Sequence, residues 1–155
     1  MRNRRSAVFS DVEKEIIGEI RALRAAPQNA RFRDLLENPA RLVYYFIQAS
    51  HGHVKLRMNA LAPALGSEMR TLQRAFADEY RETFTACQAR VRLEFSCWTL
   101  GISPPSKITA LASLLGYARV QDFTRFFKKH MHRSPTEWGR MERERIEREK
   151  QLASE

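Results

Sequence analysis

The 155-residue sequence predicts an all-α protein. Apolar residues recur at the three- and four-residue spacing of amphipathic helices, and the two-residue alternation typical of strands is nearly absent. Signals for helix starts recur along the chain. The hydrophobic content of 43% is normal for a folded domain, and the length allows one core or two small subdomains that share one.

The first helices are predicted from their start signals. Ser10 and Glu13 have the spacing of a capping box, in which each side chain bonds the other residue's backbone N–H. The helix that follows carries apolar residues along one side, and we expect it to pack on the domain. Asn38-Pro39 predicts an N-cap and a proline at the first helical position, opening the apolar helix ARLVYYFIQA. The apolar residues of the first helix are Val12, Ile16, Ile20 and Leu23.

A helix over residues 83–100 is the most informative element. Winding it at about 100° per residue puts apolar residues on two opposite stripes, with polar residues on the flanks. Such a helix must be covered on both sides, which predicts a connector between two subdomains. The segment GISPPS, residues 101–106, is expected to break the chain after it. The stripes are Phe84, Cys87, Val91, Phe95 and Trp98, and Ala89, Leu93, Cys97 and Leu100; the flanks are Gln88, Arg90, Arg92, Glu94, Ser96 and Thr99.

The last helix is predicted to begin at Ser134-Pro135-Thr136-Glu137, which combines a capping box with a proline at the first position. It runs into MERERIEREK, where opposite charges pair at helical spacing. A solvated helix is the default interpretation, and binding of a partner is the alternative. The expected ion pairs are Glu142–Arg145, Glu144–Arg148 and Glu147–Lys150.

A six-residue pattern, Leu-Ala-x-x-Leu-Gly, occurs at residues 61–66 and again at 111–116. Its Ala-x-x-x-Gly spacing is the one that a helix-turn-helix requires. The alanine allows two helices to cross closely, and the glycine ends the first helix where a positive φ costs other residues about 1 kcal/mol. We expect a small core in each unit, made by Leu61, Leu65, Leu72 and Phe76 in the first and by Leu111, Leu115, Phe123 and Phe127 in the second.

The remaining residues of each second helix are predicted to face outward. Arginine can bind guanine with two hydrogen bonds and glutamine can pair with adenine, so these faces are typical of major-groove readers. The alternative is that they are solvated faces of two ordinary helical hairpins. The candidate base-reading residues are Met69, Arg70, Gln73 and Arg74 in the first unit and Val120, Gln121, Thr124 and Arg125 in the second.

The net charge of +9 is concentrated on the segment that holds the repeat. The excess of Lys and Arg over Asp and Glu is +3 for residues 1–54, +7 for residues 55–140 and −1 for residues 141–155. A basic field of this kind attracts polyanions such as nucleic acid.

Other functional classes find little support. The longest apolar runs are too short to span a membrane, and MRNRRSAVF lacks the apolar region and cleavage site of a secretory signal. Cys87 and Cys97 cannot form a disulfide framework, and both are expected to be buried, unreactive thiols in a cytoplasmic protein. The pairs at His51/His53 and His130/His132 lack further ligands for a metal. No phosphate-binding glycine loop or nucleophile–base arrangement stands out, so neither an enzyme nor a cofactor is expected.

The second unit resembles a known family. The residues Ile108, Leu111-Ala112, Gly116-Tyr117, Phe123-Thr124-Arg125, Phe127-Lys128-Lys129, Ser134-Pro135 and Trp138 are similar to the signature of AraC/XylS-type transcription regulators, and the resemblance covers about residues 40–140. It implies two helix-turn-helix units, joined by a long helix, that dock into adjacent major-groove segments about one DNA turn, roughly 34 Å, apart.

The first unit departs from the family pattern. With Asn59 as N-cap, Pro63 would fall at the fourth helical position, where it removes a hydrogen bond. Glu68 replaces the usual serine N-cap, although Ser67 could cap one residue earlier. Arg81 and His132 stand where the family often has glycine, so Arg81 is expected to strain its turn or to contact phosphate.

The resemblance implies a double-stranded DNA-binding regulator that is cytoplasmic and associated with the nucleoid, with RNA polymerase as a candidate partner and a monomer as the expected state. An activator is the expected type, although the residues leave repression open. The alternative is a helical protein-interaction module, binding polymerase or another regulator, with a vestigial first unit. The candidate phosphate contacts are Arg81, Lys128, Lys129, His130 and Arg133.

The expected organisation has five parts. They are an N-terminal helical extension over residues 1–37, a first helix-turn-helix unit over 38–82, the connector over 83–100, a second unit over 101–140 and a charged tail over 141–155. About 40 residues with helical periodicity cannot form the β-structured sensor domain of many family members. A stand-alone regulator or a fragment of a longer protein is therefore expected.

Overall fold

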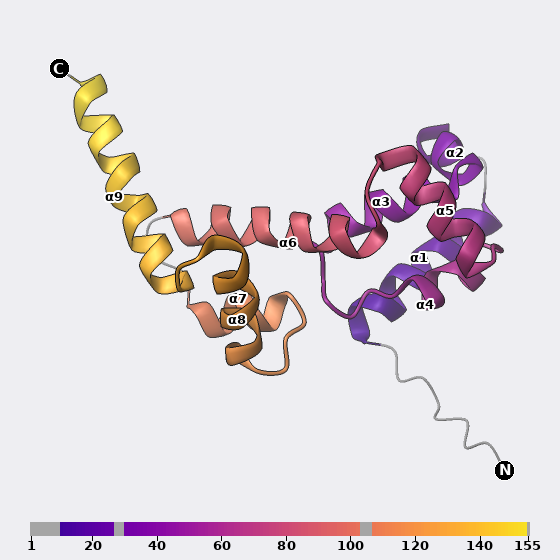
Figure 1. The fold of residues 1–155 in the computed structure, drawn as a ribbon. Helices are drawn as coiled ribbons and strands as arrows, with labels where there is room; N and C mark the ends of the chain where they lie inside the picture. The colour runs from indigo at the N-terminus through magenta and orange to yellow at the C-terminus, as the bar shows by residue number, and fades with distance from the viewer. Residues whose placement is uncertain (1–9, 27–29, 103–106, 155) are drawn as a thin grey trace, which may run out of the picture.

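The computed structural model describes residues 10–26, 30–102 and 107–154, with the backbone alone for residues 30–32. These residues form helices and no strands, which confirms the all-α prediction. The helix α6 joins a group formed by α1 to α5 to a group formed by α7, α8 and the start of α9 (Figure 1). The helices are α1 (Asp11–Ala25), α2 (Ala30–Glu37), α3 (Pro39–Ala49), α4 (Met58–Ala64), α5 (Met69–Tyr80), α6 (Phe84–Gly101), α7 (Ile108–Leu114), α8 (Val120–Met131) and α9 (Pro135–Ala153).

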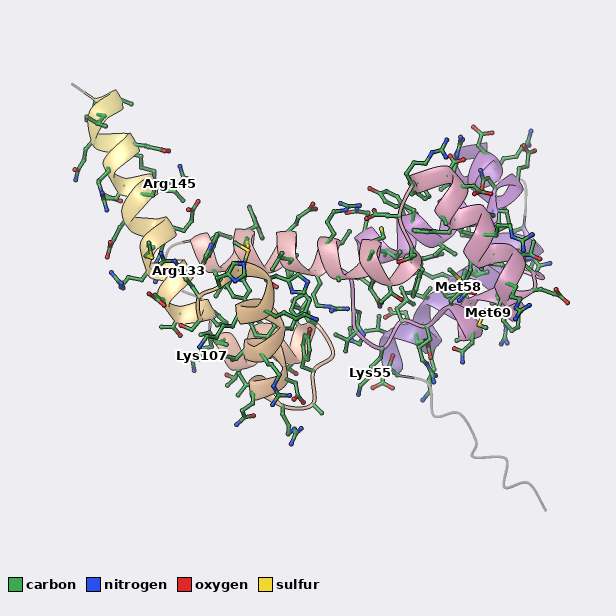
Figure 2. All side chains as sticks on the ribbon, in the orientation of Figure 1. Lys55, Met58, Met69, Lys107, Arg133 and Arg145 are labelled. Carbon is green, nitrogen blue, oxygen red and sulfur yellow. The ribbon has the colours of Figure 1, made fainter. Side chains whose placement is uncertain are left out.

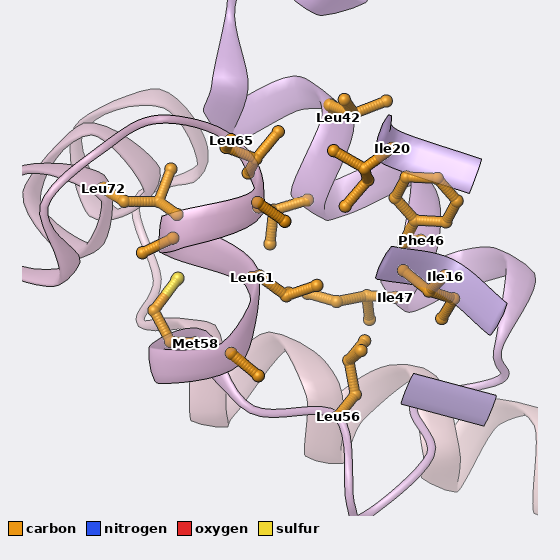
Figure 3. Close-up of a cluster of buried hydrophobic side chains, with 14 of the residues drawn as sticks. Ile16, Ile20, Leu42, Phe46, Ile47, Leu56, Met58, Leu61, Leu65 and Leu72 are labelled. Atoms are coloured by element: carbon orange, nitrogen blue, oxygen red, sulfur yellow. The ribbon is translucent and has the colours of Figure 1, made fainter. Parts of the chain in front are cut away.

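The larger of two apolar cores lies among α1, α3, α4, α5 and the first half of α6 (Figure 3). Ile20 of α1, Phe46 of α3 and Leu61 of α4 are almost fully buried in it. The N-terminal helix is therefore part of the body that carries the first helix-turn-helix unit, as its apolar stripe predicts. The pattern residues Leu61, Leu65, Leu72 and Phe76 are all buried here.

The smaller core belongs to the second unit. Leu100 of α6 meets residues of α7 and α8, and Trp138 of α9 packs against its edge. Rings of Phe127 and Trp138 meet edge-to-face at a centroid distance of 5.9 Å. All the inward residues predicted for this unit are buried, namely Leu111, Leu115, Phe123 and Phe127.

The connector helix α6 is confirmed as a helix that contacts both cores, but its two stripes do not each cover one core. Cys87 and Val91 join the first core, whereas Phe95 packs with the second. Trp98 is 65% exposed, so its predicted burial is wrong. The two units cover different halves of the helix, and position along its axis therefore decides burial as much as angular position does. Three predicted flank residues are also buried, namely Gln88, Arg92 and Ser96.

The predicted helix starts at Ser10, Asn38 and Ser134 are confirmed. Each side chain accepts a hydrogen bond from the backbone N–H three residues later. The second hydrogen bond predicted for the first capping box, from the backbone N–H of Ser10 to the Glu13 side chain, is wrong. The carboxylate of Glu13 is buried and binds Arg57 instead. Within the break predicted over residues 101–106, α6 continues to Gly101, and residues 103–106 lie outside the described part of the chain.

The last helix, α9, is only partly the solvated helix that was expected. Its first turns pack along α6, where Gly139 is buried and Arg143 Nη1 donates to the carbonyl of Leu100 at 2.7 Å. Its later turns extend away from both groups (Figure 1). Two of the expected ion pairs form, Glu142–Arg145 at 2.6 Å and Glu144–Arg148 at 3.9 Å. None of the helices in the described ranges is both long and apolar enough to cross a membrane.

Candidate nucleic-acid interface

Each copy of the repeated pattern forms a helix-turn-helix corner, α4 with α5 and α7 with α8. The two corners close with equivalent backbone hydrogen bonds. Ser67 N–H donates to the carbonyl of Ala62 at 2.9 Å, and Tyr117 N–H donates to that of Ala112 at 3.0 Å. This is the closure of a Schellman-type helix end. The prediction that the repeat encodes two corners is therefore confirmed at the level of the backbone.

The glycines of the pattern have the left-handed backbone that was predicted. Gly66 has φ +66° and Gly116 has φ +89°. At Gly116 a second requirement is added, since a Cβ would lie 2.3 Å from Cε1 of His53. The alanines of the pattern, Ala62 and Ala112, are buried as expected.

The two corners differ by one residue in the turn. The repeated patterns are 50 positions apart (111 − 61), but α8 begins 51 positions after α5 (120 − 69). The second turn is therefore one residue longer. Both second helices have 12 residues and end in a left-handed C-cap, Arg81 at φ 57° and His132 at φ 58°. The expected strain at Arg81 is confirmed, and His132 shares it.

The outward faces of α5 and α8 carry the candidate base-reading side chains. On α5, Met69, Arg70, Gln73 and Arg74 are all exposed, and Figure 2 shows Met69 at the start of the helix. On α8, Gln121 and Arg125 are exposed, whereas Thr124 and Val120, which packs against the second core, are half-buried.

The charges on the two faces are arranged differently. Arg70 and Arg74 have no ion pair with any residue that the structure describes. On α8, Asp122 binds both Arg125, at 3.4 Å, and Arg119, at 3.2 Å. Sequence reasoning overlooked Arg119 and Asp122, although their three-residue spacing indicates an ion pair. Nη1 of Arg125 thus already has a partner within the protein.

The candidate phosphate contacts lie at the C-terminal ends of these helices. Their side chains are exposed, and two have internal partners: Arg133 binds Glu137 at 3.2 Å, and His130 Nδ1 lies 2.9 Å from the carbonyl of Phe126. Lys128 and Lys129 have no ion pair within the described ranges. The candidate set is Arg81, Lys128, Lys129, His130 and Arg133.

The first corner departs from expectation at both helix starts. The N-cap of α4 is Arg57 and not Asn59, which places Pro63 at the sixth helical position. The N-cap of α5 is Glu68 without a side-chain hydrogen bond, so Ser67 does not cap it. The Ser67 hydroxyl instead donates to the carbonyl of Glu68 at 3.3 Å.

The cysteines and histidines do not form a second site. Burial raises the pKa of Cys87 to about 12 and that of Cys97 to about 11, so both thiols resist ionisation at neutral pH. Cys87 is buried as expected, and Cys97 is half-buried. Among the residues described, no group of three His, Cys, Asp or Glu side chains has a geometry that could hold a metal. His53 is buried against Gly116 of the second unit, and His51 is half-buried and stacks on Phe95 of α6.

Comparison with known proteins agrees with this geometry. A family model described as a helix-turn-helix domain, of the AraC type, matches residues 61–141, which is more than half of the chain. Among solved structures, the C-terminal domain of AraT, a response regulator from Geobacillus stearothermophilus, is similar with a TM-score of 0.60 and 25% sequence identity, covering 66% of this chain and 84% of that chain. No curated protein sequence matches. The matched region begins within α4 at Leu61 and contains the rest of the first corner, the helix α6 and the whole second corner. The chain therefore belongs to the AraC-type helix-turn-helix family of DNA-binding transcription regulators.

Proposed function

We propose that this regulator reads double-stranded DNA with two recognition helices, α5 and α8, placed in adjacent segments of the major groove. The observation that carries the proposal is the duplicated corner, in which both second helices expose Arg and Gln side chains. These are the side chains that pair with guanine and adenine edges. The excess of +7 over residues 55–140 supports the same role.

Recognition divides between the two kinds of contact. Arg81, Lys128 and Lys129 neutralise phosphates and release counterions, which contributes affinity without sequence information. The outward faces select the bases. In this proposal Val120 of α8 touches a thymine methyl group, while Gln121 and Arg125 bond the neighbouring base pairs.

Selection of bound sequences from random DNA tests the two-helix reading. We expect two half-motifs about one helical turn, or roughly 34 Å, apart. A single motif that is lost on substitution of Arg125 but not of Arg74 would mean that α8 alone reads sequence.

Alanine substitutions test whether each arginine contacts a base or a phosphate. Arg74→Ala or Arg125→Ala should cost about 1–3 kcal/mol of binding to the selected site if the side chain reads a base, and much less on random duplex. Equal losses on both DNAs would assign the residue to phosphate. Arg148→Ala, an exposed arginine near the end of α9, is the matched control and should leave both affinities unchanged.

A salt titration separates this function from a protein-interaction module. Binding to mixed-sequence DNA should weaken steeply as salt rises, with a log–log slope near −0.9 for each phosphate contacted. No binding at low salt would favour the interaction module. We also infer that the protein acts as a monomer at the nucleoid, where RNA polymerase would be its second partner.

A further inference from the structure

Residues 51–54, here called the 51–54 segment, are part of the link between α3 and α4 and lie against the turn of the second unit. Val54 N–H donates to the carbonyl of Leu115 at 2.9 Å. The ring of His53 lies directly on Gly116, so close that a Cβ there would overlap its Nε2 and Nδ1. A segment that enters the first helix-turn-helix unit is thus bonded to the corner of the second.

The same segment is fixed on its other side by α6. The carbonyl of Gly52 accepts a hydrogen bond from Arg92 Nε at 2.8 Å. Gln88 Nε2 donates to the carbonyl of His53 and, at 3.0 Å, to that of Leu56. Gly52 has φ +71°, and a Cβ there would lie 2.3 Å from the carbonyl oxygen of Gln88. Only glycine therefore allows the segment to approach α6 this closely.

Arg92 extends the connection to α8. Its Nη1 donates to the hydroxyl of Tyr117 at 3.3 Å, and its guanidinium lies 4.8 Å from the centre of the Phe126 ring. Beside it, the ring of His51 stacks on Phe95 of α6 at 3.8 Å. One buried arginine thus contacts the 51–54 segment, the second turn and the second recognition helix.

These contacts specify one arrangement of the two units. Gln88, Arg92 and His53 are each less than 9% exposed. Within the described ranges, no buried side-chain nitrogen or oxygen lacks a hydrogen-bond partner. A fully satisfied buried polar network resists rearrangement, because any rotation of one unit leaves a buried group unpaired.

We propose that the 51–54 segment, held by Gln88 and Arg92, fixes the separation of α5 and α8, so that the regulator accepts two half-sites at one spacing only. The inference rests on the proposed two-helix reading of DNA. The residues involved are positioning residues, since none of them lies on the outward faces of α5 or α8. One inserted base pair moves the second half-site by about 3.4 Å and rotates it by about 36°. Two helices held at a fixed separation cannot bind both half-sites at that altered spacing.

The first experiment measures the separation in the free protein. Spin labels are attached to ketone-bearing side chains introduced at Asp78 of α5 and Lys129 of α8, both exposed, which leaves the cysteines untouched. We expect one narrow distance distribution for the wild type and a broad one for Gly52→Ala. Gly18→Ala is the matched control, since nothing lies within 4 Å of the added Cβ, and its distribution should be as narrow as the wild type's.

His53→Ala is the second variant, because it removes the ring from Gly116 without adding any atom. Circular dichroism establishes that it keeps its helical content. Its distribution should also broaden, so the test does not depend on the folding of Gly52→Ala. Distributions as narrow as the wild type's in the folded variants would overturn the proposal.

The second experiment measures affinity for duplexes whose selected half-sites are moved apart by one or two base pairs. The wild type should lose about tenfold or more for one inserted pair, because the second unit no longer engages. His53→Ala should lose less than about threefold on insertion while binding the original spacing more weakly. Equal spacing selectivity in both would overturn the proposal. If selection yields only one half-site, the two-helix function fails, and the distance distributions still decide whether the segment fixes the units.

Discussion

Glu13 is a carboxylate on α1 that completes the start of another helix. It is fully buried, its Oε2 accepts the backbone N–H of Arg57 at 2.9 Å, and its Oε1 accepts from Arg57 Nη2 at 2.8 Å. Arg57 is the N-cap residue of α4, and its own side chain makes no capping hydrogen bond. A negative charge at that end also complements the helix dipole. At the other end, Arg24 Nη1 donates to the carbonyl of Ala64 at 2.7 Å. Helix α1 therefore holds both ends of α4.

Glu13→Gln should lower the free energy of unfolding by about 2 kcal/mol, because one amide oxygen cannot accept the three hydrogen bonds that Arg57 donates from its backbone N–H, Nε and Nη2. Urea denaturation measures the change. Glu15→Gln, an exposed neighbour on the same helix, is the control and should change stability by less than about 0.5 kcal/mol. An equal effect of both substitutions would show that Glu13 does not cap α4.

Arg81→Gly separates stability from DNA binding at one residue. Glycine adopts the left-handed φ of 57° without the strain of a Cβ, so the melting temperature should rise, by the equivalent of about 1 kcal/mol. Loss of a phosphate contact should weaken binding equally on selected and random DNA. His132→Gly relieves the same strain on α8 and gives the reference for the stability gain. A more stable variant with unchanged DNA affinity would remove Arg81 from the phosphate contacts.

At the scale of the element, α4 tolerates a proline in its interior. Pro63 is exposed and cannot donate the hydrogen bond that a sixth helical residue normally makes. The helix persists because its core residues, such as Leu61, are fully buried and because α1 holds both ends. Packing thus outweighs the local preference of the sequence.

Pro63→Ala should stabilise the protein by about 1 kcal/mol, since the restored N–H outweighs the greater freedom of the unfolded chain. Thermal unfolding followed by circular dichroism measures the shift in melting temperature. Selected-site affinity should stay within about twofold of the wild type's, because Pro63 lies outside the candidate base-reading set. A lower melting temperature would show that the proline ring stabilises the turn.

Helix α6 shows what the sequence predicts and what it does not. Its limits, and its contact with both units, follow from the apolar periodicity. Gln88, Arg92 and Ser96 share one face at four-residue spacing, a pattern that ordinarily predicts exposure to solvent. Gln88 and Arg92 are buried because the link between α3 and α4, distant in sequence, covers them and supplies the carbonyls of Gly52, His53 and Leu56 as partners. The hydroxyl of Ser96 bonds within its own helix, to the carbonyl of Arg92. Periodicity describes one helix at a time, so it cannot predict a partner that only the tertiary fold provides.

The candidate interface was more predictable from the sequence than the contact between the two units, which the 51–54 segment makes with α6 and Gly116. The inward residues of α5 and α8 were predictable from the apolar pattern, and the polar residues that remain on each helix face outward. The inward residues are Leu72 and Phe76 on α5 and Phe123 and Phe127 on α8. The ion pair of Arg125 with Asp122 was open to prediction from spacing alone. The role of His53 was not, because its contact with Gly116 joins residues whose proximity depends on the placement of two units.

For the whole molecule, the contact of the 51–54 segment with the second unit predicts that stability depends on pH. Burial lowers the pKa of His53, and the charges of Lys55 and Arg92 lower it further, while Glu13 opposes them. His53 Nδ1 accepts the backbone N–H of Lys55 at 3.3 Å, which requires the neutral ring. A histidine whose pKa is lower in the folded than in the unfolded protein contributes its full stability above about pH 6.5 and loses it as the pH falls toward the folded value.

The wild type should therefore lose stability more steeply than His53→Gln between about pH 6.5 and 5, measured by urea denaturation at each pH. Burial also lowers the pKa of His51, so His51→Gln tests the second contribution, and the double variant should show the flattest profile. Protonation of His53 places a charge against Gly116 and near the charge of Arg92, so the contact between the 51–54 segment and the second unit should loosen before either core unfolds. The distance between α5 and α8 should accordingly broaden at pH 5.5 in the wild type and stay constant with pH in the double variant. Broadening that is equal in both would assign the pH dependence to groups outside the 51–54 segment.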